Sequence, residues 1–226
     1  MKNGKEEYMR KYKYLLFDLD GTLIYSHMGI WNCFRYAMQE MGYPEPQEED
    51  LKKCIGPSLE YSFATFFGMD EASAKKATAK YREQYKVTGV WENEPIEGAL
   101  EALKSLKEAG YIMALATSKP LVFAEKISAR WGFAPYLAAE IGCGIDGSLP
   151  TKADVVREAM KQLNAKAEEC LMVGDRFYDV EGARACGVDC AMLRVGYAPE
   201  EEYEACNPAY VFKNFEELVN FLVKCE

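Results

Sequence analysis

Histidine is nearly missing from this chain of 226 residues, which contains only His27. One imidazole cannot build a zinc site with two or three histidine ligands, and the HExxH motif and the kinase HRD loop are both absent. A serine or cysteine nucleophile activated by histidine would have to use His27, and the neighbouring residues suggest no partner. The sequence therefore disfavours histidine-based zinc enzymes, HRD-type kinases and triad hydrolases.

Long apolar runs and paired cysteines are also absent. No segment approaches the roughly 18 apolar residues of a membrane span, and the charged residues 1–13 do not resemble a signal peptide. No CxxC pair occurs, and several cysteines lie in apolar runs, where a free thiol packs as a small hydrophobe. We therefore expect a cytoplasmic protein with no membrane partner. Its eight cysteines are expected to be reduced and mostly buried: Cys33, Cys54, Cys143, Cys170, Cys186, Cys190, Cys206 and Cys225.

Positive charge is in deficit, since 27 Lys and Arg stand against 36 Asp and Glu, a net charge of −9. Nucleic acids and anionic surfaces are bound by clustered Lys and Arg, so neither partner is expected. A small phosphorylated metabolite is compatible with this balance if a metal cation offsets the local charge. The oligomeric state is left open between monomer and dimer.

Short apolar runs alternate with amphipathic segments along most of the chain. Strands are expected at residues 14–17, 112–116, 170–173, 189–193 and 210–212, and helices at 98–109, 120–130, 151–163, 178–186 and 214–224. Such short apolar runs are typical of strands buried on both faces of a parallel sheet. The pattern predicts an α/β fold: a three-layer, Rossmann-like parallel sheet core with a small inserted all-helical cap domain.

The inserted segment, residues 27–94, shows apolar residues at helical spacing and no convincing strand. We expect a catalytic core of residues 1–26 and 95–226 and a helical cap of residues 27–94. An insertion at this point lies over the carboxyl end of the sheet, where open α/β folds bind ligands. Residues 25–27 and 93–95 are the expected hinge strands.

Two carboxylates follow the first apolar run, in the segment Asp18-Leu19-Asp20-Gly21-Thr22. At the carboxyl end of a parallel strand, both can reach one small site. Their mutual repulsion favours a raised pKa on one of them unless a cation intervenes. A bare DxD is more often an exposed turn, but this pair suits a nucleophile beside an acid/base.

Other expected strand ends supply matching groups. Thr117 and Ser118 follow one apolar run, at the expected start of a helix whose free N–H groups favour an anion. Asp175 follows another run, with Asp179 one helical turn later, and Lys152 opens a further helix. Each feature alone is more often a helix cap or a surface residue. Together, in this order, they indicate phosphoryl transfer.

These motifs resemble those of haloacid dehalogenase superfamily phosphatases with a helical cap, and the chain is most similar to their phosphoglycolate phosphatase-like members. The likeness runs from Tyr14 to the final helix, and Ser118-Lys119-Pro120 resembles that branch in particular. It implies roles for six residues: Asp18 as nucleophile, Asp20 as acid/base, Thr117 and Lys152 in phosphate binding, Asp175 in metal binding and Asp179 as a supporting acid.

A phosphomonoester brought beside these aspartates meets several negative charges, so the site needs cations. The resemblance implies a divalent cation held by the Asp18 and Asp175 carboxylates and the Asp20 carbonyl, with Lys152 adding a further positive charge. An all-oxygen ligand set completed by water and phosphate fits Mg²⁺ better than Zn²⁺ or Ca²⁺. Asp20 also favours phosphate esters over dehalogenation, because a halide leaving group needs no proton.

Several alternatives stay open. A 5'-nucleotidase-type phosphatase acting on nucleoside monophosphates and a β-phosphoglucomutase-type phosphotransferase would carry the same motifs. A catalytically silent binding protein is disfavoured because every catalytic group is present. Residues 142–147 match GxGxxG, yet no helix follows at once, so a dinucleotide site is disfavoured.

Substrate choice is expected to reside in the cap. The turn at Gly56 and Pro57 resembles the family's loop facing the catalytic centre, and Lys53 is a further candidate for substrate contact. The basic cap residues are expected mostly on solvated faces or in pairs along their helices. They are Arg35, Lys52, Lys53, Arg82 and Lys86.

Overall fold

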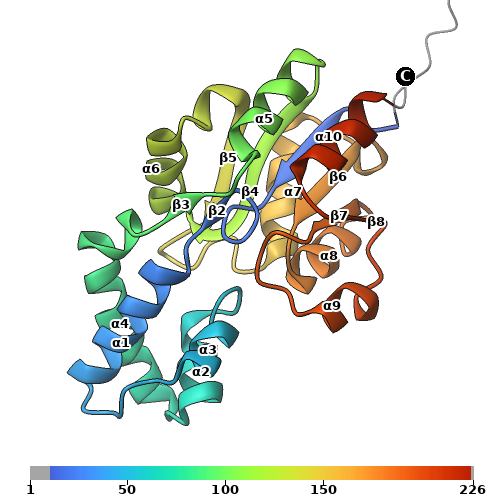
Figure 1. Ribbon diagram of the computed structural model, residues 1–226. Coiled ribbons are helices and arrows are strands. Elements are labelled where there is room, and N and C mark those ends of the chain that lie inside the picture. Colours follow the sequence, from blue (N-terminus) through green and yellow to red (C-terminus); the bar gives the residue numbers. More distant parts are fainter. Residues whose placement is uncertain (1–10, 225–226) are drawn as a thin grey trace, which may run out of the picture.

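The computed structural model describes residues 11–224 and contains a six-stranded, all-parallel sheet with the strand order β5-β4-β1-β6-β7-β8 (Figure 1). Central β1 pairs with β4 and β6, placing Phe17 beside Leu115 and Val173. The strands are β1 (Tyr14–Phe17), β4 (Ile112–Pro120), β5 (Leu137–Cys143), β6 (Cys170–Gly174), β7 (Asp189–Leu193) and β8 (Tyr210–Phe212). The predicted parallel sheet is confirmed.

Helices cover both faces of this sheet, which makes the three predicted layers (Figure 1). Side chains alternate along a strand, so Leu15 and Phe17 pack with α5, α6 and α10, whereas Tyr14 and Leu16 pack with α7 and α8. The helices are α5 (Ala99–Glu108), α6 (Leu121–Trp131), α7 (Lys152–Leu163), α8 (Phe177–Arg184), α9 (Glu200–Ala205) and α10 (Phe215–Lys224). Helix α9 was not expected, because its only buried residue is Tyr203 and it shows no apolar period.

Four α-helices and a short 3-10 helix (Gly89–Trp91) are inserted between two short strands, β2 (Ile24–Tyr25) and β3 (Glu94–Pro95), which pair antiparallel. The four α-helices form the bulk of the insertion. They are α1 (His27–Glu40), α2 (Glu48–Lys53), α3 (Leu59–Phe67) and α4 (Glu71–Val87), and they lie beside the sheet as a separate group (Figure 1). The buried Phe34 ring lies 4.8 Å from Phe63 and 5.0 Å from Tyr81 between centroids. The insertion thus has an apolar centre, which is continuous with the cluster on one face of the sheet. Its bounds as a unit, residues 27–94, stay a prediction.

Strand β4 runs further than expected. The sequence predicts its end at residue 116 and places Thr117 and Ser118 at a helix start, but β4 continues to Pro120 and α6 begins only at Leu121. The extension follows from pairing with β5, which reaches Thr117 and, after a register shift, Pro120. The helix N-terminus therefore lies beyond the two hydroxyls, and that part of the expectation is wrong.

Seven of the eight cysteines lie in the described residues, where all are free and five are buried; Cys225 lies outside them. Across residues 11–224, no helix is both long and apolar enough to cross a membrane.

Candidate active site

The carboxyl ends of three neighbouring strands bring the predicted site residues together. Asp18 follows β1, Thr117 lies near the end of β4 and Asp175 follows β6. Because β1 lies between the other two strands in register, these residues emerge at the same edge of the sheet. Lys152 is the first residue of α7, and Asp179 lies in the first turn of α8.

Lys152 lies between two carboxylates. Its Nζ donates to Asp18 Oδ1 at 2.6 Å and to the Ala116 carbonyl oxygen at 3.1 Å, and it forms an ion pair with Asp179 Oδ1 at 2.8 Å. Burial raises the pKa of Asp18 to about 6, against the opposing effect of the Lys152 charge. The lysine stem fits here because Gly182 of α8 has no side chain: a Cβ there would lie 2.4 Å from Lys152 Cγ.

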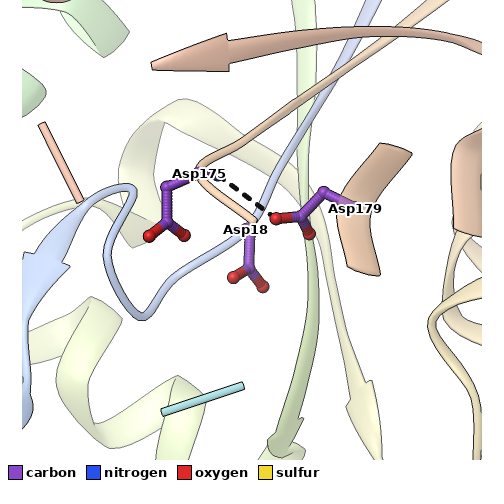
Figure 2. Close-up of side chains that lie close together, drawn as sticks. All are labelled: Asp18, Asp175 and Asp179. Carbon is purple, nitrogen blue, oxygen red and sulfur yellow. Dashed lines mark hydrogen bonds between the residues drawn. The ribbon is translucent and has the colours of Figure 1, made fainter. Parts of the chain in front are cut away.

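Asp18, Asp175 and Asp179 form a buried acidic triad, in which one carboxylate oxygen from each residue lies within 4.8 Å of the other two (Figure 2). Asp179 Oδ2 accepts the Asp175 N–H at 3.2 Å, the dashed line of Figure 2, and thereby orients the loop between β6 and α8. Asp175 has no salt bridge to any side chain of the described residues, and burial raises its pKa well above the ordinary value, with the Asp179 charge adding to the rise. Three carboxylates face only one lysine charge, and their oxygens are the available metal ligands. This set fits a small divalent cation such as Mg²⁺.

Two glycines allow the chain to close around Asp175. A Cβ at Gly21 would lie 2.3 Å from Asp175 Oδ2, and one at Gly196 would lie 2.1 Å from the same oxygen. Gly21 also has φ +81°, a backbone conformation that favours glycine. Next in the chain, Tyr197 donates its N–H to Asp175 Oδ2 at 2.7 Å. Gly196 and Tyr197 are not predictable from the sequence, since no local pattern links them to Asp175.

Asp20 has a different partner. Lys119 Nζ donates to its two carboxylate oxygens at 2.9 and 2.7 Å, and the Lys119 charge lies 5.1 Å from the centre of the Tyr85 ring of α4. The sequence indicates Lys119 only as part of a motif, because the expected strand ends at residue 116. In the structure β4 continues to Pro120. Residues two apart on a strand face the same way, so Lys119 is buried on the same side as Thr117.

A cavity of about 530 Å³ lies between the core and the inserted helices. Most of the predicted site residues line it: Asp18, Asp20, Thr117, Ser118, Lys152, Asp179, Gly56 and Pro57. Lys53 does not line this cavity; it is exposed and pairs with Asp50 at 2.9 Å within its own helix. The expectation that Lys53 contacts the substrate is therefore unsupported by its position.

The GxGxxG match has a packing explanation. Gly142 lies in β5, where a Cβ would come within 2.5 Å of the Lys119 carbonyl oxygen of β4. Helix α7 begins only at Lys152, well after Gly147. In a dinucleotide-binding turn the helix starts directly at the glycine motif, and this segment lacks that arrangement.

Comparison with known proteins agrees with this geometry. A family model described as haloacid dehalogenase-like hydrolase matches residues 15–193. A 5'-nucleotidase of Pseudomonas aeruginosa is 38% identical over 88% of this chain and 90% of its own length, and a phosphoglycolate phosphatase of Vibrio parahaemolyticus is 29% identical over 92% and 94%. The crystal structure of a predicted phosphatase from Clostridium acetobutylicum superimposes with a TM-score of 0.89 at 36% identity, over 94% of this chain and 99% of that one. The chain belongs to the haloacid dehalogenase-like hydrolase family and is a phosphatase.

Proposed function

We propose that the protein is a Mg²⁺-dependent phosphatase that hydrolyses a small phosphomonoester through an aspartyl-phosphate intermediate on Asp18. The observation that carries the proposal is the contact of 2.6 Å between Lys152 Nζ and Asp18 Oδ1 inside a buried acidic triad. Lys152 holds the Asp18 carboxylate in place at the end of β1. The other Asp18 oxygen is left for attack on phosphorus.

The reaction then has two steps. An Asp18 oxygen attacks phosphorus, the ester P–O bond breaks, and the leaving oxygen takes a proton from Asp20. Asp20 next removes a proton from water, whose oxygen attacks the same phosphorus. The bond to Asp18 breaks, inorganic phosphate leaves, and both carboxyl groups return to their initial state.

Phosphate oxygens would be bound by Lys152 and by the hydroxyls of Thr117 and Ser118, which line the cavity. Thr117 Oγ1 already accepts the Lys119 N–H at 3.2 Å, so its own proton is available to a phosphate oxygen. Mg²⁺, held by the Asp18 and Asp175 carboxylates and the Asp20 carbonyl, would offset the charge of the phosphate and its surrounding aspartates. Asp179 would keep Lys152 and Asp175 in place, through its ion pair with Lys152 and its hydrogen bond from the Asp175 N–H.

We propose further that residues 27–94 form a cap that closes the site against water, with residues 25–27 and 93–95 as its hinges. The loop between α2 and α3 supports this role. Arg176, next to Asp175, donates from Nη1 to the Ile55 carbonyl oxygen at 2.6 Å, and Gly56 lies against the Tyr178 ring. The core and the cap loop thus touch beside the acidic triad.

A second candidate substrate class is supported by the cavity wall. Tyr81 and Tyr85 of α4 stack at an interplanar angle of 10° and line the cavity with Phe123. An aromatic wall suits a nucleobase, in keeping with the 5'-nucleotidase of Pseudomonas aeruginosa among the relatives. A phosphoglycolate-like ester and a nucleoside monophosphate are therefore the two substrates to compare. Formation of an isomer from a hexose phosphate, without phosphate release, would instead identify a mutase.

Replacing Asp18 by Asn tests the proposal. We expect activity on an aryl phosphate with Mg²⁺ to fall below about 1% of the wild-type value, because the amide is not a nucleophile. The matched control is Asp70→Asn, an exposed helix cap where Asn serves equally well. Acid-quenched wild-type enzyme should carry phosphate on the peptide containing Asp18. Retained activity in D18N, or phosphate on another residue, would contradict the assignment.

A further inference from the structure

Four cationic side chains line the cavity: Arg82, Lys119, Lys152 and Arg176. Three of them are paired within the core. Lys152 bridges Asp18 and Asp179, Lys119 binds Asp20, and Arg176 forms an ion pair with Glu202, its Nε and Nη2 each donating to a carboxylate oxygen at 3.0 and 3.1 Å. Arg82 has no ion pair or hydrogen bond among residues 11–224. Among the four cationic side chains that line the cavity, Arg82 is therefore the one that is not paired with a carboxylate of the described residues.

Arg82 reaches the cavity from the cap side. It lies on α4 beside Tyr81 and about one turn before Tyr85, which also line the cavity. Across the cavity lies Cys143 at the end of β5; burial raises the pKa of this thiol, and the Arg82 charge opposes the rise. The guanidinium is thus close enough to the core for its field to act there. An anion bound between cap and core would come under the same field.

The other basic cap residues named from the sequence are differently placed. Arg35 pairs with Glu45 at 3.6 Å, and Lys52 pairs with Glu48 at 3.1 Å. Lys53 pairs with Asp50, and Lys86 does not line the cavity. Among the five, Arg82 alone both lines the cavity and lacks a partner in the described part of the chain.

From this placement we propose that Arg82 is a specificity-determining residue, which binds a second anionic group, such as a carboxylate, on the leaving-group side of the phosphomonoester. The inference rests on the proposed function, since it takes the phosphoryl group to be held by Lys152 and Thr117. A guanidinium can bind a carboxylate through two parallel hydrogen bonds. A doubly anionic substrate needs such a cation, because without one its second charge would face the site's aspartates uncompensated. The preferred substrate class is a short phosphomonoester with a carboxylate.

Two nearly isosteric substrates separate this contact from phosphate binding. We compare kcat/KM for 2-phosphoglycolate and for 2-hydroxyethyl phosphate, which replaces the carboxylate by a neutral CH₂OH group. In the wild type, phosphoglycolate should be preferred by about tenfold or more. Arg82→Gln should abolish that preference through a higher KM, with 2-hydroxyethyl phosphate changed less than about twofold. Arg82→Lys should keep part of the preference, because the charge remains.

The matched control is Lys86→Gln, which removes a cation from the same helix outside the cavity and should leave both substrates unchanged. Equal use of the two esters by the wild type would overturn the inference, as would an equal loss for both in R82Q. A thermal melt of R82Q should match the wild type, since the side chain is exposed and unpaired. Failure of the proposed function would give a different result. An active D18N variant would refute Asp18 as the nucleophile, independently of the kinetics of R82Q.

Discussion

Lys119 and Asp20 form an ion pair that joins two strand ends far apart in sequence. The distance between Lys119 Nζ and Asp20 Oδ2 is 2.7 Å, and the lysine side chain is only 4% exposed. The pair orients the proposed acid/base toward the cavity. It also lies under the Tyr85 ring of the cap, so that acid/base placement and cap contact share one side chain.

Replacing Lys119 by Met should impair proton transfer more than phosphate binding. We expect kcat for an alkyl phosphate to fall by about a hundredfold, whereas an aryl phosphate, whose leaving group needs little help from an acid, should lose far less. Steady-state kinetics with both esters measures the difference. Lys119→Arg should recover part of the alkyl activity. Equal losses for both esters would mean that Lys119 does not act through Asp20.

Asp175→Asn should stabilise the metal-free protein and remove its response to metal. The buried Asp175 carboxylate lacks a salt bridge among the described residues and lies near two other carboxylates, so neutralising it relieves repulsion. We expect Tm to rise by about 2–4 °C without metal. Mg²⁺ should raise the Tm of the wild type but not of D175N. Calorimetry with and without Mg²⁺ tests this, and a shift of equal size in both proteins would place the cation elsewhere.

The stability of the metal-free protein should depend on pH through Asp18. Its pKa is raised from 3.8 to about 6 by burial, so the folded state binds this proton more tightly than the unfolded state. The resulting stabilisation is full below pH 3.8 and is lost as pH rises through about 6. The free energy of unfolding, measured with urea from pH 3.8 to above about 6, should fall with rising pH in the wild type relative to D18N. Parallel profiles for the two proteins would contradict it.

Tyr197→Phe should loosen the hinge without touching the acidic triad. The Tyr197 hydroxyl accepts the Ser26 and His27 N–H groups at 2.7 and 3.0 Å, whereas Asp175 is bound by the main chain of Tyr197. We expect a loss of about 1 kcal/mol in the free energy of unfolding and faster amide exchange at residues 26 and 27. Tyr43→Phe is the control, because no described residue hydrogen-bonds its hydroxyl. Unchanged exchange in Y197F would show that this contact does not restrain the hinge.

Much of the core could be predicted because its signals are local. The apolar run of β1 is followed at once by Asp18 and Asp20, and the corresponding runs end next to Thr117 and Asp175. Parallel strands bring such ends to one edge whatever the loops between them do. Five of the six sheet strands, most flanking helices and the order of the motifs therefore follow from hydrophobic period and position alone. Strand β5 and helix α9 do not, because both are only partly buried and lack a clear apolar period.

What tertiary structure decided is which charges face one another. Lys53 and Arg82 are both basic residues on cap helices, yet Lys53 pairs with Asp50 and only Arg82 reaches the cavity. Likewise, Tyr197 meets Asp175, and Lys119 meets Asp20, across loops whose path no local pattern records. Short-range periodicity determines where strands and helices form. Packing between segments distant in sequence sets the rotation of each helix and the reach of each side chain, and that packing determines the partners of the charges.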